Sequence, residues 1–78
     1  MIRRNELQIQ ADILGIAREG ARKTRLVYQG NLNFNVIKPY IERLLKNGFM
    51  EFSDGFYYTT DKGLSFIDRF FSLMELEG

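Results

Sequence analysis

The apolar residues at the start of the chain recur with the period of an α-helix. Isoleucines follow Asn5 at spacings of four and three, which predicts a helix over residues 5–19 with Asn5 as its N-cap. Gly20 ends this pattern, and Arg18 lies near the helix C-terminus, where the helix dipole favours a cation. The stripe consists of Ile9, Ile13 and Ile16.

Two further helices are expected before the pattern changes. Thr24 is the expected N-cap of a short helix that continues to about residue 29 and closes at Gly30-Asn31. A third helix is expected from Asn33 onward, and Asn47-Gly48 supplies its left-handed terminus. The inward stripe of this third helix is Phe34, Ile37, Ile41 and Leu44.

Pro39 lies inside the third apolar stripe. Proline removes a backbone N–H and crowds the preceding turn, so either the helix kinks at this point or it starts nearer Asn35. The pattern leaves both alternatives open.

From residue 49 to residue 59 the period becomes that of a β-strand. Asp54-Gly55 favours a two-residue type I′ turn, because both residues tolerate the positive φ that this turn requires. The turn pairs Ser53 with Phe56, Phe52 with Tyr57, and Met50 with Thr59. One face of the hairpin, able to cover a core, then holds Met50, Phe52, Tyr57 and Thr59, and the other holds Glu51, Ser53, Phe56 and Tyr58. Thr60 is the expected N-cap of a last helix over residues 61–76.

This order of elements predicts a single domain over residues 1–78. The length is enough for one hydrophobic core and too short for a second. Three helices with a short Gly-containing connection between the second and third, then a hairpin and a fourth helix, form a winged helix-turn-helix, a mainly α fold with a β-hairpin. In such a fold the third helix suits the major groove of a duplex.

The composition narrows the chemistry that the chain can perform. Hydrophobic residues make up 45% and charged residues 27%, which favours a soluble globular chain. A cytoplasmic location is expected, because no apolar run is long enough to cross a bilayer and the first residues do not form a secretory signal. There is no Cys for a disulfide or zinc knuckle and no His for an imidazole base, and Asp12, Asp54, Asp61 and Asp68 have no catalytic or metal-ligand spacing. We therefore expect no enzyme activity, metal, cofactor or small-molecule substrate.

Charge is divided unevenly along the chain, although the net charge is only +1. Residues 1–48 hold nine Lys or Arg against four Asp or Glu, whereas residues 49–78 hold two against six. A basic half suits phosphate binding, since neutralising phosphates releases counterions, but solvated helices also carry unequal charge. If the stripe of the third helix faces inward, its outward residues are Asn35, Lys38, Glu42, Arg43 and Lys46. Asn can pair with adenine, Arg with guanine, and Lys can reach a base edge or a phosphate.

Several short motifs occur together between about residues 9 and 70. They are Gly20-Ala21-Arg22-Lys23-Thr24-Arg25, Tyr28, Asn31-Leu32-Asn33, Tyr40-Ile41, Leu44, Tyr57 and Thr60-Asp61-Lys62-Gly63. The combination closely resembles the small archaeal winged-helix proteins, which include dimeric nucleoid-associated proteins and predicted transcriptional regulators. This resemblance implies double-stranded DNA as the partner and a nucleoid-associated location. It also implies that Lys23, Thr24 and Arg25 lie near phosphates at the start of the second helix, where free N–H groups attract an anion.

Each of these positions also has a purely structural interpretation. Thr24 could be only a cap, Asn31 and Asn33 favour turns for local reasons, and Tyr28 could pack half-buried instead of donating to a phosphate. Arg3 and Arg4 could add backbone contacts or belong to a frayed terminus. The candidate DNA-binding residues are Lys23, Thr24, Arg25, Tyr28, Asn33, Asn35, Lys38, Arg43 and Lys46.

The last helix is apolar around more than half of its girth. A core this small covers one stripe only, so a second molecule is expected to cover the rest. The expected dimer interface, within residues 61–77, is Leu64, Ile67, Phe70, Phe71 and Met74. The resemblance implies the same homodimer helix, and about two heptads favour a compact pairing. The alternative is that the helix folds back over the first helix.

The tip of the hairpin, Ser53-Asp54-Gly55, carries an acid and no Lys or Arg, so it is not expected to clamp a phosphate. The outward aromatics Phe56 and Tyr58 could touch sugar edges or a second subunit. A second functional hypothesis follows, in which the chain is a protein-interaction winged helix that uses its aromatic hairpin and last helix and binds no DNA.

Overall fold

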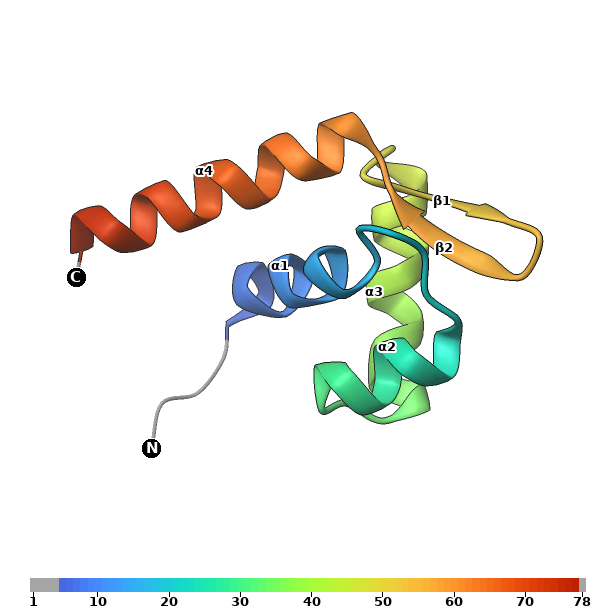
Figure 1. The fold of residues 1–78 in the computed structure, drawn as a ribbon. Coiled ribbons are helices and arrows are strands. Elements are labelled where there is room, and N and C mark those ends of the chain that lie inside the picture. Colours follow the sequence, from blue (N-terminus) through green and yellow to red (C-terminus); the bar gives the residue numbers. More distant parts are fainter. Residues whose placement is uncertain (1–4, 78) are drawn as a thin grey trace.

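The computed structural model describes residues 5–77. Its elements are, in order, α1 (Glu6–Ile16), α2 (Lys23–Gly30), α3 (Phe34–Lys46), β1 (Met50–Ser53), β2 (Phe56–Thr59) and α4 (Asp61–Glu77). Figure 1 shows the hairpin projecting to one side of the three-helix group, and α4 running over α1 toward the opposite side. This is the winged helix-turn-helix arrangement, and we call the β1–β2 hairpin the wing.

Asparagine caps begin two of the helices. The side chain of Asn5 accepts a hydrogen bond from the Gln8 N–H at 2.7 Å, and that of Asn33 accepts one from the Val36 N–H at 2.8 Å. The expected cap of α1 is therefore confirmed. Because α3 begins at Phe34, a start nearer Asn35 is wrong, and Pro39 lies inside the helix.

Helix α1 ends at Ile16, three residues before the expected end. The carbonyl of Ala17 accepts hydrogen bonds from the Gly20 N–H at 3.1 Å and from the Thr59 N–H of the wing at 3.0 Å. The chain turns here because the wing takes up backbone acceptors that further helix would have needed. Gly20 completes the turn at a φ of 101°.

Helix α2 begins two residues earlier than expected, at Lys23, and Thr24 is not its cap. Arg22 is the N-cap residue and makes no side-chain capping hydrogen bond. The reason is a non-local β-bridge between Ala21 and Tyr57, which holds the chain extended up to Arg22. Asn31 closes the helix in the left-handed conformation, at a φ of 55°.

The wing has the predicted register. Its pairs are Met50 with Thr59, Glu51 with Tyr58, Phe52 with Tyr57 and Ser53 with Phe56. Asp54 and Gly55 have φ values of 52° and 84°, which fit the positive φ that a type I′ turn needs at both positions. The bridge from Ala21 adds a third strand segment outside β2.

Four aromatic residues are placed differently from their expected faces. Phe52 is 55% exposed, because the wing extends past the helices and its tip has nothing to cover. Phe56 and Tyr58 are expected to face outward but are half-buried, and the Tyr58 ring lies beside Gly20. Phe34 is exposed as well, since it occupies the first position of α3, before the helix reaches the core.

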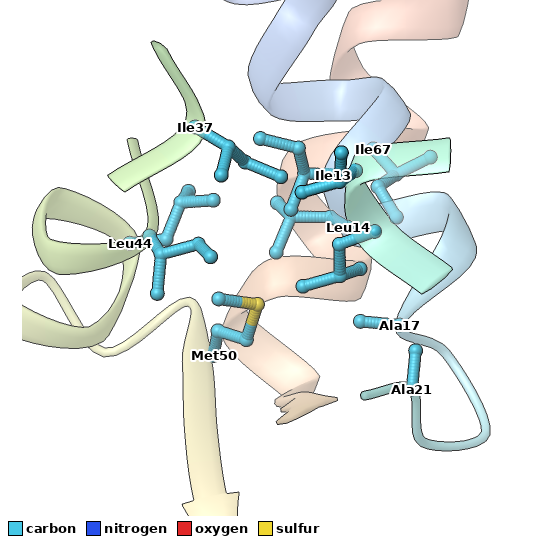
Figure 2. Close-up of a cluster of buried hydrophobic side chains, with 11 residues drawn as sticks. Ile13, Leu14, Ala17, Ala21, Ile37, Leu44, Met50 and Ile67 are labelled. Carbon is cyan, nitrogen blue, oxygen red and sulfur yellow. The ribbon is translucent and has the colours of Figure 1, made fainter. Parts of the chain in front are cut away.

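The core lies where all the elements meet (Figure 2). Its fully buried large side chains are Ile13 and Leu14 of α1, Leu26 of α2, Ile37 and Leu44 of α3, Met50 of β1 and Ile67 of α4. Burial of each such side chain contributes about 1.5–3 kcal/mol relative to exposure. Among the described side chains, those of residues 5–75, no buried nitrogen or oxygen lacks a hydrogen-bond partner. This core sets the angle of α3 relative to the wing and α2.

Thr60 starts α4 and also ties it to the end of α3. Its Oγ1 accepts a hydrogen bond from the Gly63 N–H at 3.1 Å and donates one to the Gly48 carbonyl at 2.6 Å. The expected cap is confirmed, and α4 continues to Glu77, one residue past the expected end. None of the described helices combines the length and apolar character that a membrane crossing requires.

Candidate nucleic-acid interface

The outer face of α3 is polar and exposed. Ile37, Ile41 and Leu44 face the core, as expected, and the five expected outward residues are all exposed. These five are Asn35, Lys38, Glu42, Arg43 and Lys46. At about 100° per residue, Lys38 and Arg43 mark the two edges of an arc about 140° wide, with the other three between them.

The two edges of this arc have different surroundings. Lys38 lines a shallow groove that faces the wing, together with Lys23, Ile41, Glu42, Leu45 and Tyr57. Arg43 leans toward α1, where its Nη1 lies 3.7 Å from Glu6 Oε2 and its guanidinium lies 5.9 Å from the Tyr40 ring centroid. An exposed ion pair of this length contributes little, so the Arg43 side chain is free to exchange Glu6 for another anion.

Pro39 also lies on the exposed side of α3. By helix geometry it falls inside the arc, beside Lys46 and Arg43. Its missing N–H deprives the Asn35 carbonyl of the usual helical donor. The arc therefore combines cations and an amide with one acid, Glu42, whose carboxylate can accept a hydrogen bond from cytosine.

The start of α2 adds cations to the same side of the molecule. Arg22, Lys23 and Thr24 line a second groove with the wing residues Phe52, Gly55 and Tyr57. Lys23 and Tyr57 belong to both grooves, so the start of α2, the outer face of α3 and the wing form one continuous surface. Arg22 was not among the candidate residues, because only the non-local bridge at Ala21 brings it beside the wing.

Arg25 is separated from this surface. It lines a different groove, between α1, α2 and α4, with neighbours that include Arg18, Gln29 and Phe71. Arg25 follows Lys23 by two residues, which on a helix is about 200°, so the two side chains point to opposite sides. The structure therefore does not bring Lys23, Thr24 and Arg25 together.

The remaining candidates of the α2–α3 turn differ in what they do. Tyr28 is 80% exposed, so the half-buried packing role is wrong. It shares a helix face with Thr24, four residues before it. Asn33 is exposed, and its side-chain oxygen caps α3, which confirms its local turn role. Asn35, two residues on, lies within the exposed arc.

The expected dimer residues of α4 divide into two groups. Ile67 is 1% exposed and Phe70 is also buried, so these two lie in the chain's own core because α4 packs on α1. Their expected place in a subunit interface is wrong. Leu64 is half-buried against the core, and only Phe71 and Met74 of the expected set are exposed, together with Leu73. Helix α4 thus folds back over α1, as the second alternative expected, and still exposes apolar residues farther along.

The described part of the chain forms no metal-binding cluster. It contains no group of three or more His, Cys, Asp or Glu side chains placed to hold a metal ion. Its surface exposes cations, amides and aromatic rings.

Comparisons with known proteins agree with this architecture. A family model described as winged helix-turn-helix matches residues 3–78. An uncharacterized protein of Methanocaldococcus jannaschii is 29% identical over 75 residues, which cover 95% of this chain and 77% of the relative. A second uncharacterized protein of the same organism is 30% identical over 69 residues, but the match spans only 33% of that longer relative.

A solved structure has the same fold. Sso10a-2, a DNA-binding protein from Sulfolobus solfataricus, superposes with a TM-score of 0.83 at 24% sequence identity, over 95% of this chain and 82% of that one. At this identity the likeness is one of fold. Together with the family model, which covers nearly every residue, it leads to one conclusion: the chain belongs to the winged helix-turn-helix family.

Proposed function

We propose that this chain binds double-stranded DNA and inserts α3 into the major groove. The observation that supports this most directly is the exposed arc of α3, which carries Lys38, Arg43 and Lys46 around Asn35. A helix is about 10–12 Å across with its side chains, and the major groove is about 12 Å wide. That the similarly folded Sso10a-2 is a DNA-binding protein supports the same proposal.

In this proposal the start of α2 contacts the phosphate backbone. The contacts come from the helix N-terminus and from Arg22, Lys23 and Thr24. The first N–H groups of α2 have no intrahelical acceptor, and Arg22 provides no side-chain cap, so they remain available to an anion. Tyr28, on the same face as Thr24, adds a hydroxyl donor. Arg25 lies on the opposite side and contributes only to the general positive field.

The protein acts as a regulator or an architectural protein of the nucleoid and not as an enzyme. A readout of bases by α3 would favour a regulator, whereas binding through phosphates alone would favour an architectural role. The absence of a Cys, a His and a described metal-ligand group supports a binding role without catalysis. Such a protein works in the cytoplasm, at the chromosome.

The test is a fluorescence anisotropy titration with a duplex of about 20 bp, two helical turns, at several salt concentrations. We expect a steep loss of affinity with salt, and Lys46→Ala should reduce the slope of log K against log salt by about 0.9 per phosphate contact removed. Arg69→Ala, an exposed cation on α4, is the matched control and should leave the slope unchanged. Affinity that does not depend on salt or on Lys46 would contradict the proposal.

The proposed active form is a homodimer that pairs through α4. Phe71 and Met74 are exposed, as is Leu73, and a second copy of α4 would bury them with a gain of roughly 1.5–3 kcal/mol each. A two-fold dimer presents two copies of α3, so palindromic sites are favoured. Light scattering should give twice the monomer mass of 9.2 kDa, and the double variant Phe71→Ser with Met74→Ser should be monomeric. A wild-type monomer at micromolar concentration would rule this pairing out.

A further inference from the structure

Phe52 presents an aromatic ring to solvent on the rim of the groove between the wing and α2. More than half of this side chain is exposed, although it belongs to a hairpin face that begins with buried Met50. Its ring centroid lies 4.8 Å from that of Tyr57, at an interplanar angle of 52°. The Phe52 ring is therefore in contact with Tyr57 while more than half of the residue stays exposed to solvent.

Cations lie on the opposite wall of this groove. Arg22 and Lys23 come from the start of α2, and Lys23 also lines the adjoining groove that leads to Lys38. The path from Phe52 to Lys38 thus passes two further basic side chains. The wing itself has none, since its tip ends in Asp54.

Both cations of this groove also lie close to aromatic rings. Lys23 Nζ lies 5.8 Å from the Phe34 ring centroid, and the Arg22 guanidinium lies 4.8 Å from that of Phe56. We call Arg22, Lys23, Phe34, Phe52 and Tyr57 the aromatic strip. A positively charged groove with exposed rings is the usual surface for single-stranded nucleic acid, because the rings stack on bases while the cations meet phosphates.

A fully paired duplex offers no free base face on which such a ring can stack. Its base faces are stacked inside the helix, and only base edges and the backbone are open to a protein. The wing itself offers a duplex backbone the acid Asp54 and no cation of its own. An unpaired nucleotide offers both a free base face, on which a ring of the strip can stack, and a phosphate, which its cations can bind.

We propose that the aromatic strip holds an unpaired DNA nucleotide whose base stacks on Phe52, so that the chain prefers DNA with a single-stranded segment to fully paired DNA. The inference rests on the proposed DNA binding and names its substrate class. The duplex flank lies on α3, and the unpaired strand passes between the wing and α2.

The sequence has no Trp, so Phe52→Trp introduces the only indole of the chain at the proposed contact. Oligo(dT) of about ten nucleotides is the probe, since small binding folds cover about 4–16 nucleotides. We expect the indole fluorescence to be quenched by oligo(dT) and by a duplex that contains an unpaired gap. A fully paired duplex of the same length should change it little.

Affinities measured by anisotropy provide the second readout. Phe52→Leu keeps an apolar side chain but removes the ring, and it should weaken binding of the gapped duplex by about 5- to 150-fold, the range for stacking of one base. The affinity for the fully paired duplex should stay within a factor of about two, and circular dichroism checks the fold. Leu7→Ala is the matched control, because Leu7 is 52% exposed on α1, outside the strip, and should change neither affinity.

The outcomes separate this inference from the proposed function. No preference for the gapped duplex, an unquenched indole, or equal loss on both DNAs in Phe52→Leu would overturn the inference, while Lys46-dependent duplex binding would leave the proposed function intact. Binding of oligo(dT) without any binding of paired duplex would support the strip and overturn the proposed function. Binding of neither DNA would overturn both.

Discussion

The hydroxyl of Thr59 donates a hydrogen bond of 2.6 Å to the carbonyl of Leu14, 45 residues earlier in the chain. Leu14 lies in the last turn of α1, where carbonyls lack helical partners, so the wing supplies a donor that the helix cannot. The adjacent Thr59 N–H bonds to Ala17. Two hydrogen bonds from Thr59 thus join the wing to the C-terminal end of α1.

Thr59→Val should lower the free energy of unfolding by about 1–2 kcal/mol, because the side-chain shape is kept while a part-buried acceptor loses its partner. Urea unfolding followed by circular dichroism measures the change. Thr24→Val removes an exposed hydroxyl and is the control, which should stay within about 0.5 kcal/mol. Equal stability of the two variants would show that the Leu14 contact contributes nothing.

Gly63 is required by close packing, and not by its backbone angles. A Cβ at this position would meet the carbonyl oxygen of Phe49 and lie 2.6 Å from Thr59 Cγ2. Gly63→Ala should therefore destabilise the fold by about 1–3 kcal/mol or more. Gly15→Ala is the matched comparison, because its Cβ would meet nothing within 4 Å inside α1, and it should stabilise the chain by about 0.5–1 kcal/mol. Thermal unfolding of both variants checks the opposite signs.

Pro39→Ala should stabilise the chain. Proline in a helix interior is about 3 kcal/mol less favourable than alanine, and the greater freedom of alanine in the unfolded chain offsets about 0.4–1 kcal/mol of this. A net gain of about 2 kcal/mol in urea unfolding is expected, against a change of at most about 0.5 kcal/mol for the exposed control Glu42→Ala. A loss of stability would mean that the proline ring packs usefully at this site.

Asp54→Asn should strengthen DNA binding at low salt. Asparagine tolerates the left-handed φ of 52° at the wing tip, and the substitution removes one negative charge that would face the phosphates in the proposed complex. An affinity gain of about two- to fivefold corresponds to the few tenths to 1 kcal/mol of one exposed charge. Asp68→Asn on α4 is the control for net charge alone. An equal gain in both variants would place the wing away from the DNA.

The elements themselves could be predicted from the sequence wherever the determinants are local. Asn5 and Asn33 begin helices because their side chains bond the backbone three residues on, and Asp54-Gly55 sets the whole register of the wing. The apolar stripe of α3 likewise identified Ile37, Ile41 and Leu44 as its buried face. These relationships join residues that are close together in the sequence, so the local sequence pattern is enough to predict them.

The candidate site was less predictable, because it depends on contacts between distant segments. Strand alternation assigns Phe52 and Met50 to one face, but it does not say where the helices stop covering that face. Arg22 joins the site only through the bridge between Ala21 and Tyr57, which has no local signal. Arg25 could have been excluded in advance, since its helical angle differs from that of Lys23 by about 200°.

That bridge also determines how the wing behaves when something touches it. Two backbone hydrogen bonds, of 2.9 and 2.8 Å, clamp Ala21 to Tyr57, so the hairpin cannot tilt without carrying the first residues of α2 with it. We therefore expect β2 and the first residues of α2 to move together as one rigid body relative to the core. A DNA strand that enters the groove and displaces the wing tip would reorient Arg22 and Lys23 in the same motion. Binding of a strand in the groove would thus change how these two cations contact the phosphates.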